Sequence, residues 1–327
     1  MSSAQATALL YFGKLPSRGD FVRSAQQPGL LQSVDRWMSG ALERMAIDAR
    51  WKELYDRAPP CHFAVLGPQQ SHAVAGHLRP SADASGRRFP FMVASSVALS
   101  APARFLPRAP LALGRLWAQA QDWARRAQSD PDAGPLLTAL SQQRPEVPSD
   151  PETQDAAMAD FLDGQSLGSV QALLAAAHPE VDLARVVMGL GLLLQPVPAS
   201  GIQRLDKGLR LPLPADALHQ PFMVAWWLEL VTGFLLRADF EVLLLLPQGQ
   251  AAPCLLVGFA GGSAVALADV LGRPDPDGPF VDLVNPAWAD DAGGQDYGLK
   301  KLRSYLQQQG LSLRQATHTF REAFLGE

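Results

Sequence analysis

The sequence predicts an α/β protein: a layered α/β/α sandwich with a mixed sheet, followed by a second α/β domain. Three observations indicate this class. Short apolar runs bounded by glycine or proline are typical of buried strands. Longer stretches repeat apolar residues every three or four positions, as amphipathic helices do. Segments of both kinds alternate along the chain, with connections that suit helices on both faces of a sheet.

The length predicts two domains. The chain has 327 residues, of which 47% are hydrophobic and 18% charged, so it can bury a large core. Residues 129–155 are rich in proline and polar side chains, which is typical of a surface connection. We therefore expect an N-terminal domain over residues 1–140 and a C-terminal α/β domain over residues 150–327.

Charge and cysteine content exclude several classes of protein. A net charge of −4 argues against a nucleic-acid-binding protein, which normally carries a basic face. Cys61 and Cys254 lie far apart beside apolar residues, which indicates reduced core thiols. No basic segment precedes an apolar run at the N-terminus, and the most apolar runs, 186–194 and 241–247, are shorter than a membrane span. We expect a cytoplasmic protein that does not span a membrane.

In the N-terminal part, the apolar patterns predict strands and helices in turn. Residues 30–45 carry an apolar stripe at helical spacing, and residues 89–98 are apolar on both sides, as in a strand covered on both faces. In chain order we expect a strand at 9–12, helices at 30–45 and 47–57, strands at 62–66, 71–78 and 89–98, and a helix at 111–127.

The C-terminal part also mixes the two kinds of element. Residues 221–237 are apolar on most sides and predict a largely buried helix, and Ser263 is placed to cap the helix that follows it. We expect helices at 156–162, 167–177, 221–237, 263–271, 296–309 and 311–324, strands at 241–246, 254–259 and 280–284, and an irregular or extended segment at 201–214.

Residues 13–22, GKLPSRGDFV, predict a shaped loop between two apolar pairs. Pro16 fixes its own φ angle, and Gly13 and Gly19 allow backbone angles that other residues avoid. The loop holds Lys14, Arg18 and Asp20 close together. They can pair internally, cradle a phosphate or form a docking surface; a P-loop is disfavoured, because no Ser or Thr follows the lysine.

Residues 80–88 predict a second shaped loop. Asp83 can accept hydrogen bonds from neighbouring main chain, and Gly86 allows a positive φ angle. Arg87 and Arg88 stand where the chain re-enters a strand. Our structural hypothesis is that this loop meets the first one, with Asp83 or Asp20 pairing an arginine across the two.

These two blocks resemble the TagF family, the type VI secretion system-associated proteins. Residues 13–22 look like the opening signature of the family, and residues 80–91, PSADASGRRFPF, resemble a later pattern of Pro-Ser, Asp, Gly-Arg and Phe-Pro. The departure lies at Ala82, where a valine is more usual. The motifs cover about the first third of the chain, as a TagF-like N-terminal domain, and the remainder resembles longer members more loosely.

The resemblance implies a cytoplasmic protein of Gram-negative bacteria that represses type VI secretion after translation. It implies binding to the forkhead-associated scaffold protein Fha, with no catalytic activity and no cofactor. We expect six residues to contribute to docking or to shape the docking surface: Lys14, Arg18, Asp20, Asp83, Arg87 and Arg88. The alternatives are an enzyme with an anion site between loops 13–20 and 80–88, or a structural subunit of the secretion apparatus.

The sequence shows no recognisable catalytic frame. It lacks HExxH and CxxC, and no carboxylate pair stands in a known spacing. The histidines at 62, 72 and 77 fit no zinc pattern, and Gly258, Gly261 and Gly262 do not fit GxGxxG. We therefore expect no metal site and no nucleotide site.

Overall fold

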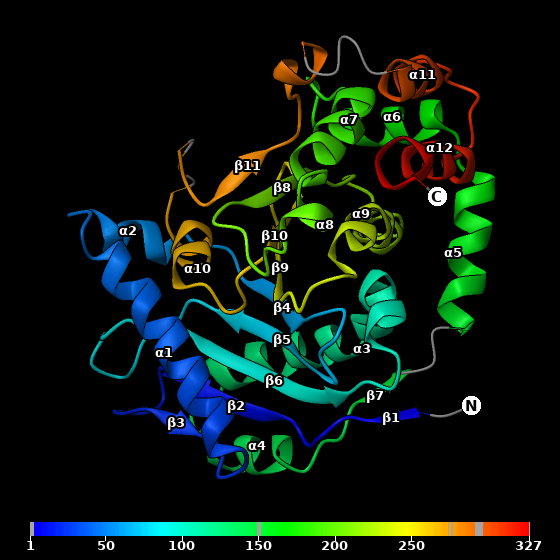
Figure 1. Ribbon diagram of the computed structural model, residues 1–327. Coiled ribbons are helices and arrows are strands. Elements are labelled where there is room, and N and C mark those ends of the chain that lie inside the picture. Colours follow the sequence, from blue (N-terminus) through cyan, green and yellow to red (C-terminus); the bar gives the residue numbers. More distant parts are fainter. Residues whose placement is uncertain (1–2, 149–151, 274, 276, 292–296, 327) are drawn as a thin grey trace.

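The computed structural model describes residues 3–148, 152–273, 275, 277–291 and 297–326. Within these residues nine strands form one mixed sheet, and helices cover both of its faces (Figure 1). This arrangement confirms the predicted α/β class. A separate pair of strands, β1 (Ser3–Gln5) and β7 (Glu146–Pro148), lies beside the large sheet, and β7 belongs to a segment that the sequence analysis treats as a connection.

The large sheet is mostly antiparallel. Its strand order is β11-β8-β10-β9-β4-β5-β6-β2-β3, and the pair of β11 with β8 is parallel. The strands are β2 (Leu10–Gly13), β3 (Val22–Arg23), β4 (Cys61–Leu66), β5 (His72–Arg79), β6 (Phe91–Ala98), β8 (Gly208–Pro212), β9 (Val242–Pro247), β10 (Cys254–Gly258) and β11 (Phe280–Asp282).

The two predicted domains share this sheet. β4 pairs with β9 over its whole length, from Cys61 opposite Pro247 to Leu66 opposite Val242. Strands from before and after the predicted boundary are therefore neighbours in one hydrogen-bonded ladder, which we call the β4–β9 seam. The division at residues 140–150 stays a prediction, but it does not separate two sheets.

Alternate residues of the strands face two helical layers. Phe63 belongs to the core beneath one layer, and the next residue, Ala64, belongs to the core beneath the other. The first layer is α1 (Pro28–Met45), α2 (Trp51–Asp56) and α10 (Ala264–Leu271). The second is α3 (Pro102–Ser129), α4 (Ala133–Leu140) and α9 (Gln220–Leu235).

The apolar stripe of α1 faces the sheet as predicted. Its buried residues are Leu31, Val34, Trp37, Met38, Ala41 and Met45. Trp37 Nε1 donates a hydrogen bond to Ser263 O at 3.0 Å, which ties α1 to the start of α10. Ser263 caps α10 through a hydrogen bond that its side chain accepts from Ala266 N, as predicted.

Helix α3 begins nine residues earlier than predicted. Pro107 and Pro110 lie inside its N-terminal part, and prolines are normally read as helix breakers because each removes a main-chain hydrogen bond. Leu106 and Ala109, beside them, are fully buried. Burial of this face against the core offsets the lost hydrogen bonds. The sequence pattern also missed α4, which lies in the segment predicted to be a connection.

The remaining helices are α5 (Glu152–Gly164), α6 (Leu167–Ala175), α7 (Leu183–Leu194), α8 (Val197–Ser200), the short helix η1 (Ala287–Asp290), α11 (Tyr297–Leu306) and α12 (Leu313–Leu325). Helices α6, α7, α11 and α12 lie beyond the β8–β11 end of the sheet, whereas α5 runs from α12 towards α3 and α8 lies beside α9 (Figure 1). Trp226 Nε1 of α9 donates to Thr317 Oγ1 of α12 at 2.9 Å and joins this end group to the second layer.

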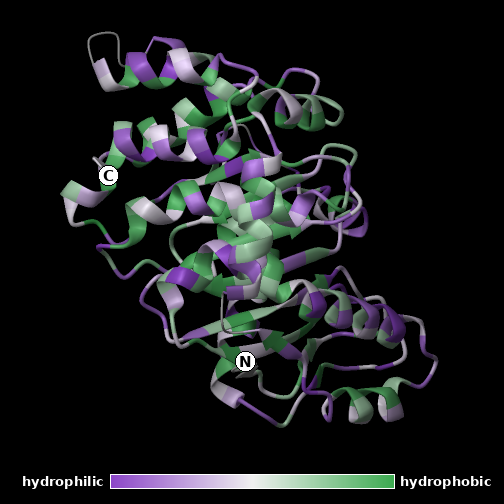
Figure 2. Ribbon diagram, turned by 90° about the vertical axis from the view of Figure 1, so that its right-hand side faces the viewer, coloured by the Kyte–Doolittle hydropathy of each residue, from purple (hydrophilic) through white to green (hydrophobic). Residues whose placement is uncertain are grey.

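Hydrophobic residues gather where these helices meet the sheet, and hydrophilic residues mark the outer sides of the helices (Figure 2). Among the described residues one helical stretch, Leu183–Ser200, is long and apolar enough to cross a membrane by length and composition alone. Half of that stretch is buried inside the structure, as in a core helix. Cys61 and Cys254 are buried free thiols.

Candidate interaction surface

The two motif loops leave the same end of the sheet. The first loop (residues 13–22) follows β2, and the second loop (residues 80–88) leads into β6. The pairing of Gly13 with Phe91, at the start of β6, brings the two loops together. Gly13 has a φ angle of +134°, and a Cβ atom there would lie 1.9 Å from Pro90 O. Only glycine allows the two chains to approach so closely at this point.

Asp83 is the centre of an ion cluster between the loops. Its carboxylate contacts Lys14 Nζ at 2.9 Å and Arg87 Nε at 2.7 Å, and its side chain is inaccessible to solvent. Ser85 Oγ and the main-chain N–H of Arg87 also donate to it, at 2.7 and 3.0 Å. We call Lys14, Asp83 and Arg87 the Asp83 cluster.

The surroundings of Asp83 stabilise its charged form. Burial alone would raise the pKa of this carboxyl, but the hydrogen bonds from Ser85, Lys14 and Arg87 outweigh burial and hold the pKa well below its usual range. Asp83 therefore stays ionised at neutral pH. Its charge is used to hold the loops together and is not presented to solvent.

Main-chain contacts reinforce this junction. Ala84 N donates to Arg18 O at 2.8 Å, and Arg87 donates from its guanidinium to Gly19 O at 2.7 Å. Ser81 Oγ donates to Lys14 O at 2.7 Å. Ser81 is itself held by Tyr55, whose hydroxyl accepts from Ser81 N at 2.9 Å and donates to Ser81 O at 3.1 Å. The second loop is thus fixed to α2 as well as to the first loop.

The other three predicted site residues point to different neighbours. Arg18 pairs with Asp132, the N-cap residue of α4, at 2.7 Å. Arg88 forms a two-pronged pair with Asp56 at the end of α2, at 2.7 and 2.6 Å. Asp20 accepts a hydrogen bond from Phe21 N within its own loop.

An exposed aromatic residue lies over the junction. Phe21 is 42% exposed, stacks on Phe12 with ring centroids 5.6 Å apart, and meets the edge of Phe89 at 4.8 Å. Lys14 Nζ lies 4.9 Å from the centre of the Phe21 ring. We call Phe12, Phe21 and Phe89 the Phe21 cluster. Exposed aromatic residues and arginines are enriched in protein–protein interfaces, and this junction exposes Phe21 and Arg87.

The structure thus brings Lys14, Asp83 and Arg87 together and leaves Arg18, Asp20 and Arg88 around them. The loops meet as hypothesised, but the residue that pairs with Asp83 across them is Lys14 and not an arginine. Sequence reasoning missed the partners Tyr55, Asp56 and Asp132, because no local pattern reveals which distant residue completes an ion pair. Phe21 lies between Asp20 and Val22, and this local sequence gives no signal of its exposure.

Of the histidines at positions 62, 72 and 77, two are in contact on neighbouring strands of the sheet. His62 and His77 face each other across β4 and β5, with their Nδ1 atoms 3.0 Å apart, and His62 stacks on Trp117. Burial lowers the pKa of His62 to about 4 and that of His77 to about 2. Both rings are therefore neutral at pH 7. The described residues contain no group of three or more His, Cys, Asp or Glu side chains that could hold a metal ion.

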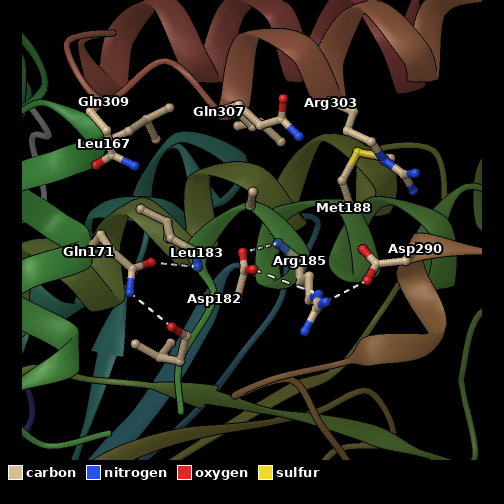
Figure 3. Close-up of a pocket in the computed structure, with 13 residues that line it drawn as sticks. Leu167, Gln171, Asp182, Leu183, Arg185, Met188, Asp290, Arg303, Gln307 and Gln309 are labelled. Carbon is tan, nitrogen blue, oxygen red and sulfur yellow. Dashed lines mark hydrogen bonds and ion pairs between the residues drawn. The ribbon is translucent and has the colours of Figure 1, made fainter. Parts of the chain in front are cut away.

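A separate cavity of about 530 Å³ lies among the C-terminal helices (Figure 3). On one wall, Gln171 bridges Val181 O and Leu183 N, and Arg185 pairs with Asp290 at 2.6 Å. Arg303 and Gln307 lie on the opposite wall (Figure 3), and Arg303 donates to Ala289 O. None of these residues is among the predicted site residues. Because its charged groups are paired with each other or with main chain, this cavity has little unpaired charge with which to attract an ion.

Residues 10–142 match the TagF N-terminal domain, which is type VI secretion system-associated. The search of curated proteins found no match to the chain. Among solved structures, the chain is similar to PA0076 from Pseudomonas aeruginosa PAO1, with 25% sequence identity and a TM-score of 0.36. That match covers 43% of this chain and 65% of PA0076, which is less than two thirds of the latter.

The domain match includes both motif loops and every member of the Asp83 cluster. The family resemblance predicted from residues 13–22 and 80–91 is therefore confirmed. Residues 10–142 of the chain are therefore assigned to the TagF N-terminal domain, which is type VI secretion system-associated.

Proposed function

We propose that this protein is a cytoplasmic, post-translational repressor of type VI secretion that acts by binding the forkhead-associated scaffold Fha. The observation that carries the proposal is the Asp83 cluster. Its ion pairs hold the two loops in one shape, and the Phe21 ring and the Arg87 side chain are exposed at their junction. Such a surface is suited to hold a macromolecule rather than to transform a small one.

In this proposal the protein works by occupancy. It binds the scaffold in a state that cannot support assembly, and the degree of repression follows the free energy of that complex. No step requires a nucleophile, a cofactor or a metal. An enzyme with an anion site between the loops would need cationic side chains free to meet the anion, whereas Lys14, Arg18, Arg87 and Arg88 each have a carboxylate partner in the described structure.

The test has two parts. Secretion of a type VI effector is measured in cells that lack the protein and in cells that overproduce it, and the affinity of the purified protein for purified Fha is measured by calorimetry. A repressor predicts release of secretion on deletion, silence on overproduction and direct binding. Loss of secretion on deletion would identify a structural subunit instead, and absence of binding would refute the scaffold as the partner.

A further inference from the structure

The free edge of the large sheet at β3 lies beside an open groove. β3 is the last strand of the sheet order and has two residues, Val22 and Arg23. The groove has a volume of about 790 Å³ and lies between this edge and the first turns of α1. Its apolar wall is formed by Phe12, Pro28 and Leu31, and Arg23 lines it as well. We call it the edge groove.

The ladder leaves the main chain of Arg23 unpaired. Ser24 N donates to Tyr11 O at 3.0 Å, and Arg23 lies opposite Phe12 in the register. In an antiparallel ladder the residues alternate, so Arg23 is a non-hydrogen-bonded residue whose N–H and C=O point away from β2. In the described part of the chain, the main chain of Arg23 has no hydrogen bond outside the strand ladder, and its guanidinium has no partner.

The charge nearest the strand edge is positive, because Arg23 belongs to β3 itself. Arg23 is exposed, and the first turn of α1 has no acidic residue and no side-chain cap, so the positive end of the helix is not compensated. Asp35 adds a negative charge farther along the groove, on α1, where its carboxylate accepts a hydrogen bond from Ser39 Oγ. The stacking of Phe21 on Phe12 extends the apolar wall of the groove to the exposed surface.

We propose that an extended, acidic segment of the partner protein adds to β3 as a further strand and places apolar side chains in the edge groove. Strand addition to an open sheet edge uses main-chain hydrogen bonds for affinity and alternate side chains for specificity. An acidic residue lies beside Arg23, on the face of the sheet that also carries Phe12. An apolar residue two positions away lies on the same face, because side chains alternate along a strand.

This inference rests on the proposed function, because the partner used to test it is Fha. The probe is purified Fha, and the affinity of the full-length chain is compared with that of three variants. Arg23→Pro removes the outward N–H, and the ladder with β2 does not use that group. Arg23→Glu keeps the main chain and reverses the charge, and Phe21→Ala removes the exposed ring. Arg115→Glu is the matched control, since Arg115 is an exposed arginine on α3.

Strand addition predicts that Arg23→Pro and Arg23→Glu each weaken binding at least about tenfold, which corresponds to the loss of one or two hydrogen bonds. Phe21→Ala weakens it as well, and Arg115→Glu leaves it within about twofold. In hydrogen exchange, the amide of Arg23 exchanges fast in the free wild-type protein and slowly in the complex. If Arg23→Pro does not fold, the affinity of Arg23→Glu and the hydrogen exchange of the Arg23 amide test strand addition without it.

The possible negative results refute different proposals. If the wild type binds Fha and the Arg23 variants bind equally well, the strand-addition proposal is refuted and the proposed function stands. If the wild type does not bind Fha, both proposals fall. If the wild type is a dimer that Arg23→Pro converts to monomers, the edge pairs with a second copy of the chain, and the proposal of a partner segment is wrong.

Discussion

Lys14 and Asp83 form an ion pair at 2.9 Å that joins the two motif loops, and their side chains are only 8% and 0% exposed. Removing one partner of a buried pair leaves the other charge without compensation, which costs more than the pair itself contributes. The remaining contacts of Asp83, from Ser85 and Arg87, come from its own loop. The pair with Lys14 is therefore the ionic link between the loops at this carboxylate.

We expect Lys14→Met to lower the melting temperature by several degrees and to loosen the first loop, because Asp83 stays buried with less compensation. Asp83→Asn is expected to lower it as well. Since the pKa of Asp83 is depressed in the folded state, its contribution to stability is present above the unfolded pKa of about 3.9 and is lost as pH falls below that value. Thermal unfolding at pH 7 and pH 3 checks this: the gap between wild type and Asp83→Asn should shrink in acid, and a constant gap would contradict it.

Arg88→Ala is expected to leave the melting temperature nearly unchanged. Its partner Asp56 is half exposed, so solvent screens the pair and the net contribution to stability is small. If the surface docks Fha, the same variant weakens binding. Calorimetry and thermal unfolding on one preparation separate the two effects. A large fall in melting temperature would mean that Arg88 shapes the loop rather than docks.

Gly13→Ala is expected to lower the free energy of unfolding by about 3 kcal/mol or more, because the φ angle is positive and the added Cβ meets the Pro90 carbonyl. Gly19→Ala in the same loop is the control, since a Cβ there has no neighbour within 4 Å. Urea unfolding of both variants measures the difference. Equal stability of the two would show that β2 and β6 can shift apart without cost.

The histidine pair is expected to make the fold sensitive to mild acid. His62 and His77 have depressed pKa values in the folded state, whereas unfolded histidines take up protons near pH 6.5. Because the unfolded state binds more protons, stability falls as pH drops from about 6.5 towards 4, by about 1.4 kcal/mol per pH unit for each histidine that stays neutral. Urea unfolding between pH 7.5 and 4.5 should show a flatter curve for the double variant His62→Gln, His77→Gln. Parallel curves would exclude the pair as the cause.

A chain that ends at residue 148 is expected to aggregate. It would lose β9, so β4 would become an open, apolar edge, and the faces covered by α9 and α10 would be exposed. Expression of residues 1–148 with and without a separate chain of residues 149–327 tests this. A soluble, monomeric fragment with native-like melting would show that the predicted N-terminal domain is independent.

Much of this fold is predictable from local patterns. The stripe of α1, the strands β4, β5 and β9, and the cap at Ser263 follow from apolar spacing and from residue types that act on their immediate neighbours. The N-terminal part of α3 does not follow from such patterns, because Pro107 and Pro110 are unfavourable inside a helix. Packing of this part against the core stabilises the helix despite them. Local patterns also predict only part of the site. They predict both loops, but they do not predict the pairs of Arg18 with Asp132 and Arg88 with Asp56, because these depend on how distant elements pack together.

The β4–β9 seam also has a consequence for biosynthesis. Its two strands are far apart in the chain, so closing this ladder carries a large loop-closure cost and is expected to be slow. During translation, β4 emerges from the ribosome long before β9 is synthesised. For that interval the edge of β4 that later pairs with β9 has no hydrogen-bonding partner. The abundance of the folded protein in the cell would then depend on chaperone capacity as much as on the rate of synthesis.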